Sequence, residues 1–122
     1  MTLLLVDDSP AFRDRLRRML SVCPGVEIAG EAGDGATALA RIGWLRPDAV
    51  LLDLHMPGTD GFGVLRELKT RGSNIPVIVL TSDVTESVRE RCSVLGAYAV
   101  IDKQDAADAV PSALRQLAER GL

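Results

Sequence analysis

Several side chains that could take part in chemistry stand at the ends of short apolar runs in this sequence. In the stretch LLDLHMPGTDG, residues 51–61, such a run ends in the carboxylate of Asp53. The other groups share this placement and are the acids Asp7 and Asp8, the hydroxyl of Thr81 and the ammonium of Lys103. Brought together, they would place three carboxylates beside a hydroxyl and a cation.

Three carboxylates in one place favour a bound cation. At a separation of ~5 Å and an effective dielectric of ~20, each like-charged pair costs about 3 kcal/mol, so either an acid takes up a proton or a cation binds. Because the ligand atoms are all oxygens, Mg²⁺ or Mn²⁺ is favoured over zinc. The set suits phosphoryl transfer with Asp53 as the nucleophile. Lys103 and the metal would neutralise the phosphoryl oxygens, and the Thr81 hydroxyl would donate a hydrogen bond to the acyl phosphate.

Five segments are predicted to form strands. Dense apolar runs without polar alternation are typical of strands buried on both faces of a parallel sheet, and residues 2–6, 49–53 and 76–81 have this pattern. Residues 26–32 are interrupted by charges and a glycine, which indicates an edge strand. Residues 98–102 could form the other edge.

Apolar residues recur at helical spacing between these strands. Ser9 is expected to cap the first helix, with Pro10 at its first position, and Asp105 is expected to cap the last. Gly72 and Gly96 are expected to end the third and fourth helices. The second helix is expected to carry a stripe of small residues, namely Ala36, Leu39, Ala40 and Gly43.

Strands that alternate with helices predict an α/β fold, here a flavodoxin-like (βα)5 doubly wound, five-stranded parallel sheet with strand order 2-1-3-4-5. In this order the first and third strands are neighbours, and ligands bind beyond their carboxyl ends. Asp7, Asp8 and Asp53 would therefore meet in one crevice, with Thr81 and Lys103 on the same rim.

Composition excludes several classes of function. The net charge of -3 argues against direct nucleic-acid binding, which needs a basic surface. No apolar run approaches a membrane span, and MTLLLVDDSP lacks the basic region of a signal peptide. Cys23 and Cys92 have no metal-ligand spacing and are expected to be reduced thiols in a cytoplasmic protein.

Each feature taken alone has a simpler interpretation. An Asp-Asp pair after a strand is usually a helix cap, a threonine at a strand end is usually a β-former, and a single lysine is usually a surface charge. The occurrence of all of them, in order, at the ends of the appropriate strands favours a site.

The stretches LVDDSP, LLDLHMPGTDG, VIVLTS and GAYAVIDK together resemble the receiver domain of two-component response regulators. The resemblance runs from Leu3 to the last helix, so residues 1–122 are expected to form a single receiver domain. Its most specific part is the set Asp53, Met56, Pro57 and Gly61. The stretch VCPGVEIAGEAGDGATAL also resembles the branch whose members carry a LuxR-type helix-turn-helix output.

The resemblance implies a switch controlled by phosphorylation. A sensor histidine kinase or a phosphotransfer protein would transfer its phosphoryl group to Asp53. Asp8 and Asp53 would bind Mg²⁺ directly, with the backbone carbonyl of His55 as a further ligand, and Asp7 would act through a water bound to the metal.

The resemblance also implies how the switch would move. Thr81 and Lys103 would hold the phosphoryl group, and Thr81 would move toward it on activation. Many receivers couple this threonine to an aromatic residue, but Val100 stands at that position here. Tyr98 is expected on the same strand face and is a candidate replacement.

The fourth helix, fifth strand and fifth helix are expected to form the surface that changes. Its charged residues could pair across a phosphorylation-dependent homodimer, or could equally form a solvated face. They are Glu86, Arg89, Glu90 and Arg115.

The residue two positions after Asp53 separates several alternatives. His55 there could tune the lifetime of the phosphoryl group together with Asp83, or could be an exposed loop residue. Phosphatases of the haloacid dehalogenase family need an acid at this position, so turnover of external substrates is not expected.

An FMN-binding flavodoxin would need a phosphate cradle that the first loop lacks. The remaining alternative is a pseudo-receiver, an interaction module without phosphoryl chemistry, although such proteins usually lose an acid or the lysine.

Overall fold

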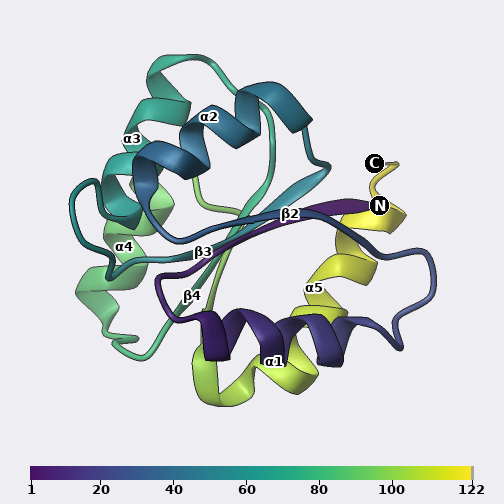
Figure 1. The fold of residues 1–122 in the computed structure, drawn as a ribbon. Helices are drawn as coiled ribbons and strands as arrows, with labels where there is room; N and C mark the ends of the chain where they lie inside the picture. Colours follow the sequence, from purple (N-terminus) through teal and green to yellow (C-terminus); the bar gives the residue numbers. More distant parts are fainter. Residues whose placement is uncertain (122) are drawn as a thin grey trace.

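A five-stranded parallel sheet forms the centre of the computed structural model, which describes residues 1–121 (Figure 1). The strands are β1 (Thr2–Val6), β2 (Glu27–Ala32), β3 (Ala49–Asp53), β4 (Val77–Thr81) and β5 (Ala99–Asp102). They lie in the order β2-β1-β3-β4-β5, all parallel. This confirms the predicted flavodoxin-like topology and the two predicted edge strands.

Helices cover both faces of the sheet. They are α1 (Pro10–Leu20), α2 (Gly35–Leu45), α3 (Gly61–Thr70), α4 (Glu86–Val94) and α5 (Ala106–Glu119), with a short 3-10 turn η1 (Lys103–Asp105) before the last. Figure 1 shows α1 and α5 on one side of the sheet and α2, α3 and α4 on the other. One hydrophobic cluster joins the sheet to α1 and α5, and a second joins it to α2, α3 and α4. Residues 3–5, 50–52 and 77–80 are almost wholly buried between them, because helices pack on both sides of a parallel sheet.

Local capping explains where the helices begin. Ser9 caps α1 as predicted, since its Oγ accepts a hydrogen bond from the amide of Phe12 at 3.2 Å. Asp105 stands at the N-cap position of α5 as predicted, but its side chain makes no capping hydrogen bond. The η1 turn intervenes there, and Asp102 caps it by accepting from the amide of Gln104 at 2.9 Å.

The predicted stripe on α2 is rotated from the face that packs on the sheet. Ala36, Ala40 and Gly43 are exposed, whereas the buried residues of this helix are Gly35, Ala38 and Ile42. Small residues are tolerated on both faces of a helix, so they indicate the buried face less clearly than the larger apolar side chains of α1 and α5 do.

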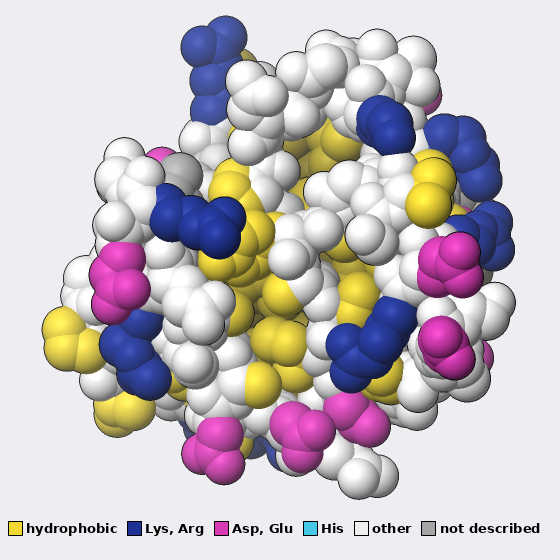
Figure 2. Space-filling model, turned by 180° about the vertical axis from the view of Figure 1, so that it is seen from behind, with side chains coloured by type: hydrophobic (Ala, Val, Ile, Leu, Met, Phe, Trp, Pro, Cys, Tyr) yellow, Lys and Arg dark blue, Asp and Glu magenta, His cyan; other side chains and the backbone are white. Residues whose placement is uncertain are grey.

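The face opposite to that of Figure 1 carries the β5 edge of the sheet, because β2 lies at the front in Figure 1. Figure 2 shows hydrophobic side chains exposed in a hollow across the middle of this face, with basic and acidic side chains around its margin. Among residues 1–121 no helix has both the length and the apolar character needed to cross a bilayer.

Candidate functional site

The predicted acids come together at the carboxyl ends of β1 and β3. These strands are paired, with Val6 opposite Leu52, so the residues that follow them lie side by side. One carboxylate oxygen from each of Asp7, Asp8 and Asp53 lies within 4.8 Å of the others. Asp7 is 2% exposed and Asp53 is 4% exposed, whereas Asp8 is exposed to solvent. The predicted convergence of the three acids is therefore present.

Lys103 brings a positive charge to the same cluster. Its Nζ lies 2.8 Å from Oδ2 of Asp7 and 3.6 Å from Oδ1 of Asp53. The ring of Phe12, on α1, lies beneath this ammonium with its centroid 4.4 Å from Nζ, a cation–π contact. The lysine is thus held between two acids and an aromatic face, although it follows β5 at the far edge of the sheet.

Burial and repulsion act together on the Asp53 carboxyl. Burial is the largest cause that raises its pKa, and the neighbouring Asp7 and Asp8 charges raise it further. Lys103 and the amide of His55 act in the opposite direction without offsetting this rise. A further cation beside Asp53 would therefore favour its ionised form.

Backbone amides fix the orientation of the two buried acids. The amide of Ser9 donates to Oδ1 of Asp7 at 2.8 Å, and the amide of His55 donates to Oδ1 of Asp53 at 3.3 Å. Within the described part of the chain, Oδ2 of Asp53 receives no hydrogen bond. This oxygen is the one left available to react.

Thr81 ends β4 next to the acid cluster. Asp53 pairs with Leu80 in the β3–β4 ladder, so Thr81 lies one residue further along the neighbouring strand. Thr81 is fully buried, and its Oγ accepts a hydrogen bond from the amide of Asp83 at 3.1 Å. The hydroxyl proton remains available for a second partner.

The turn after Asp53 requires a glycine at the start of α3. A Cβ on Gly61 would lie 2.4 Å from the carbonyl oxygen of Asp53 and 2.7 Å from Cα of Leu54, which is closer than real Cβ contacts. The Gly61 amide instead donates to the carbonyl of Leu54 at 3.1 Å. The helix therefore closes directly against the segment that carries Asp53.

Tyr98 does not share a face with Val100, so that expectation is wrong. Tyr98 packs with the cluster under α1 and α5, and its hydroxyl donates to Oε1 of Gln116 at 3.4 Å. Val100 packs against the other cluster. Tyr98 precedes β5, so the two-residue alternation of a strand does not extend to it. It cannot replace an aromatic residue at position 100.

Two contacts in the site were missed from the sequence. Arg13 donates from Nη1 to the backbone carbonyl of Asp7 and pairs with Glu31 on β2. The helix segment PAFRDRLRRML holds four arginines, and nothing in its pattern distinguishes Arg13 from the others. The contact of Phe12 with Lys103 likewise joins residues far apart in sequence.

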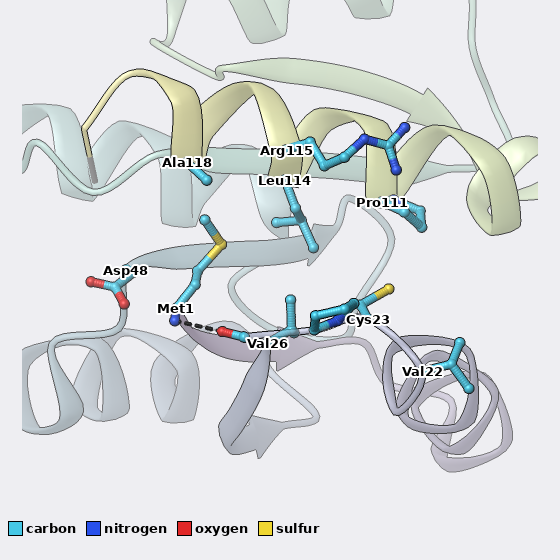
Figure 3. Close-up of a pocket in the computed structure, with 11 residues that line it drawn as sticks. Met1, Val22, Cys23, Val26, Asp48, Pro111, Leu114, Arg115 and Ala118 are labelled. Atoms are coloured by element: carbon cyan, nitrogen blue, oxygen red, sulfur yellow. Dashed lines mark hydrogen bonds between the residues drawn. The ribbon is translucent and has the colours of Figure 1, made fainter.

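A cavity of about 490 Å³ lies at the opposite end of the sheet (Figure 3). It is lined mainly by apolar residues that precede β1 and β2 or belong to α5, including Met1, Val26 and Leu114. The ammonium of Met1 donates to the carbonyl of Gly25 at 2.7 Å beside it. This cavity is separate from the acid cluster. It lies at the amino ends of the parallel strands, whereas the acids lie at their carboxyl ends.

Comparison with known proteins gives consistent matches over most of the chain. Residues 3–115 match the family model described as response regulator receiver domain. The chain is 39% identical over 118 residues to protein-glutamate methylesterase/protein-glutamine glutaminase 2 of Anaeromyxobacter dehalogenans (strain 2CP-C), covering 97% of this chain and 32% of that protein. It is 45% identical over 100 residues to response regulator MprA of Mycobacterium avium (strain 104), covering 81% and 42% respectively. The chain thus spans about a third of the length of its methylesterase relatives.

Solved structures share the same fold. The signal receiver domain of response regulator NarL from Mycobacterium tuberculosis superposes with a TM-score of 0.90 at 30% identity, covering 97% of this chain and 95% of that one. A structure of RcsB from Salmonella enterica serovar Typhimurium, bound to promoter rprA in the presence of the phosphomimetic BeF3-, gives a TM-score of 0.88 at 26% identity, covering 97% and 98%.

Proposed function

The chain belongs to the response regulator receiver domain family, and on this premise we propose that residues 1–122 form a single switch domain whose phosphoacceptor is Asp53. The observation that carries this assignment is the cluster of three carboxylates within 4.8 Å. Lys103 Nζ lies 2.8 Å from one of them and 3.6 Å from another. The pseudo-receiver alternative is not favoured, since every acid and the lysine are present.

The donor is a phosphohistidine on a sensor histidine kinase or a phosphotransfer protein. Oδ2 of Asp53 attacks phosphorus, and an acyl phosphate forms as the phosphorus–nitrogen bond breaks. The electrons of that bond go to the imidazole, which takes up a proton. Lys103 stabilises the phosphoryl oxygens, and the Thr81 hydroxyl donates to the product.

The donor set fits a magnesium or manganese ion. Three carboxylate oxygens stand together, and burial followed by the negative charges of Asp7 and Asp8 raises the pKa of Asp53. Asp8, Asp53 and the backbone carbonyl of His55 would hold the ion, with Asp7 acting through a water molecule. When bound, the ion supplies charge neutralisation for the transferring phosphoryl group.

The test is phosphorylation of the intact chain by a small-molecule phosphodonor with MgCl2, followed by intact mass measurement. The expected result is a gain of a single phosphoryl group that is absent with EDTA or in Asp53→Asn. Asp60→Asn is the matched control, because Asp60 caps α3 outside the cluster and its replacement should leave the gain unchanged. An unmodified native protein, under conditions in which a known receiver reacts, would favour the pseudo-receiver.

On this proposal the chain is cytoplasmic and catalyses only its own phosphorylation and dephosphorylation. It acts by changing the partners that its surface binds. Two outputs are proposed as alternatives for the protein to which this domain belongs. One is a LuxR-type DNA-binding output, and the other is a methylesterase output like that of its relatives. Direct nucleic-acid and membrane binding by this domain are not proposed.

The surface of α4, β5 and α5 is where phosphorylation would promote a homodimer. Glu86, Glu90 and Arg115 are exposed there and could pair across subunits. Arg89 already donates from Nη1 to the carbonyl of Val100 at 3.1 Å, so it would have to leave that bond to take part. Analytical ultracentrifugation before and after phosphorylation tests this: an unchanged sedimentation coefficient would exclude the dimer.

A further inference from the structure

Arg13 connects the end of β1 to the neighbouring edge strand. Its Nη1 donates a hydrogen bond to the backbone carbonyl of Asp7, and its Nε lies 2.9 Å from Oε1 of Glu31 on β2. Glu31 also accepts from Nε of Arg17 at 2.5 Å. A single guanidinium thus joins α1, β1 and β2 beside the acid cluster.

The Arg13 connection is better shielded from water than its neighbour. The Arg13 side chain is 18% exposed, whereas that of Arg17 is 45% exposed. Burial acts to raise the pKa of Glu31, but the hydrogen bonds and charges of Arg17 and Arg13 outweigh it and the pKa is lowered. The acid is therefore ionised, and charge-assisted hydrogen bonds of this kind are the strong ones.

The orientation of the Asp8 carboxylate is set by the backbone that carries it. Both carboxylate oxygens of Asp7 are held, by the amide of Ser9 and by Lys103. Across residues 1–121, in contrast, no group donates a hydrogen bond to the Asp8 carboxylate. The carbonyl of Asp7 and the amide of Asp8 belong to one planar peptide unit, so a bond that fixes this carbonyl also fixes the unit from which the Asp8 side chain projects.

We propose that Arg13 is a positioning residue for the metal site. It holds the Asp7–Asp8 peptide so that the exposed Asp8 carboxylate stays with Asp53 and Asp7, and it thereby strengthens binding of the divalent cation. This inference rests on the proposed function, because it takes Asp8 to be a metal ligand. Arg13 itself acts through the backbone and contacts no carboxylate of the cluster.

The sign of the effect separates positioning from simple electrostatics. Arg13 is a cation near a cation site, so removing its charge alone would strengthen Mg²⁺ binding. Loss of positioning has the opposite effect, and outer-shell residues of metal sites are typically worth tenfold or more in affinity. Arg13→Gln is therefore expected to weaken Mg²⁺ binding about tenfold.

The experiment titrates the full chain with MgCl2 by isothermal calorimetry. Arg17→Gln is the matched control, because Arg17 contacts the same Glu31 but not Asp7, and its affinity should stay within about twofold of wild type. Arg13→Lys keeps the positive charge but lacks the guanidinium whose nitrogens reach both the Asp7 carbonyl and Glu31. This variant should also bind Mg²⁺ more weakly than wild type. In metal-free protein, the amide NMR resonance of Asp8 should shift in Arg13→Gln and not in Arg17→Gln.

The outcomes are distinguishable. Wild-type affinity or tighter binding in Arg13→Gln refutes the role of Arg13 while leaving the magnesium site in place. Absence of Mg²⁺ binding in wild type refutes the site itself and with it the role of Arg13. Thermal unfolding verifies that each variant is folded, and Arg13→Lys carries the comparison if Arg13→Gln does not fold.

Discussion

Replacing Asp53 by asparagine is expected to stabilise the metal-free protein at neutral pH. The two side chains have nearly the same shape, so the change removes a charge with little effect on packing. The pKa of Asp53 is raised, mainly by burial, which means that the folded state resists ionisation of this group. A neutral residue escapes that cost.

The magnitude follows from the opposing charges around Asp53. At the 4.8 Å upper limit of their separation and an effective dielectric of ~20, Asp7 repels Asp53 by at least about 3.5 kcal/mol, and Lys103 at 3.6 Å attracts it by about 4.6 kcal/mol. Asp8 adds only about 1 kcal/mol of repulsion, because it is exposed and water screens it. These contributions nearly cancel, so the cost of burying the charge decides the result. We expect a gain of about 2 kcal/mol in the free energy of unfolding.

The pH dependence has a definite sign. For a group whose pKa is raised by folding, the favourable contribution is full below the unfolded pKa and is lost as pH rises through the folded pKa. Wild type therefore loses stability relative to Asp53→Asn as pH rises from the acid range toward neutrality. The difference should shrink again as pH falls below the raised pKa of Asp53.

The assay is urea denaturation in EDTA at several pH values, repeated with saturating MgCl2. Magnesium should stabilise wild type more than Asp53→Asn, since a ligand that binds only the folded state stabilises it. Asp8→Asn is the control, with an expected gain of less than about 1 kcal/mol because that carboxylate is solvated. Equal stability of wild type and Asp53→Asn in EDTA at neutral pH would refute the electrostatic reasoning, as would a gain that magnesium does not reduce.

Three further predictions concern the site and its support. Lys103→Ala should slow phosphoryl uptake at least about tenfold in a time course of intact mass, because it removes the cation nearest Asp53; a rate equal to wild type would contradict this role. Gly61→Ala should lower the free energy of unfolding by at least about 2 kcal/mol, because the added Cβ would meet the carbonyl oxygen of Asp53. Gly43→Ala is the control: its Cβ would stand in open space within a helix, so it should raise the free energy of unfolding by about 0.5 kcal/mol. Leu114→Ala should cost about 3 kcal/mol in urea denaturation, because this α5 side chain is almost wholly buried against the sheet; a cost below about 1 kcal/mol would contradict this and show that neighbouring residues fill the space left by the substitution.

The sequence by itself determined the sheet and the principal members of the site. Apolar runs without alternation are typical of parallel strands that helices bury on both faces, and the charged second run indicated an edge strand, which favours the order 2-1-3-4-5. That topology makes β1 and β3 neighbours, so residues 7, 8 and 53 had to converge. The short-range signals were equally reliable where one residue decides a local geometry, as at Ser9 and at the left-handed Gly72 and Gly96.

Only the tertiary structure decided contacts that join residues far apart in the chain. Arg13 reaches Asp7 and Glu31, and Phe12 lies beneath Lys103, but no periodicity marks these residues among the other side chains of α1. Tyr98 packs with α5 because a strand's alternation applies only inside the strand, and its boundary is set by pairing with β4. Long side chains can reach several partners, and which partner they meet depends on how the helices are rotated and placed on the sheet, which local sequence does not specify.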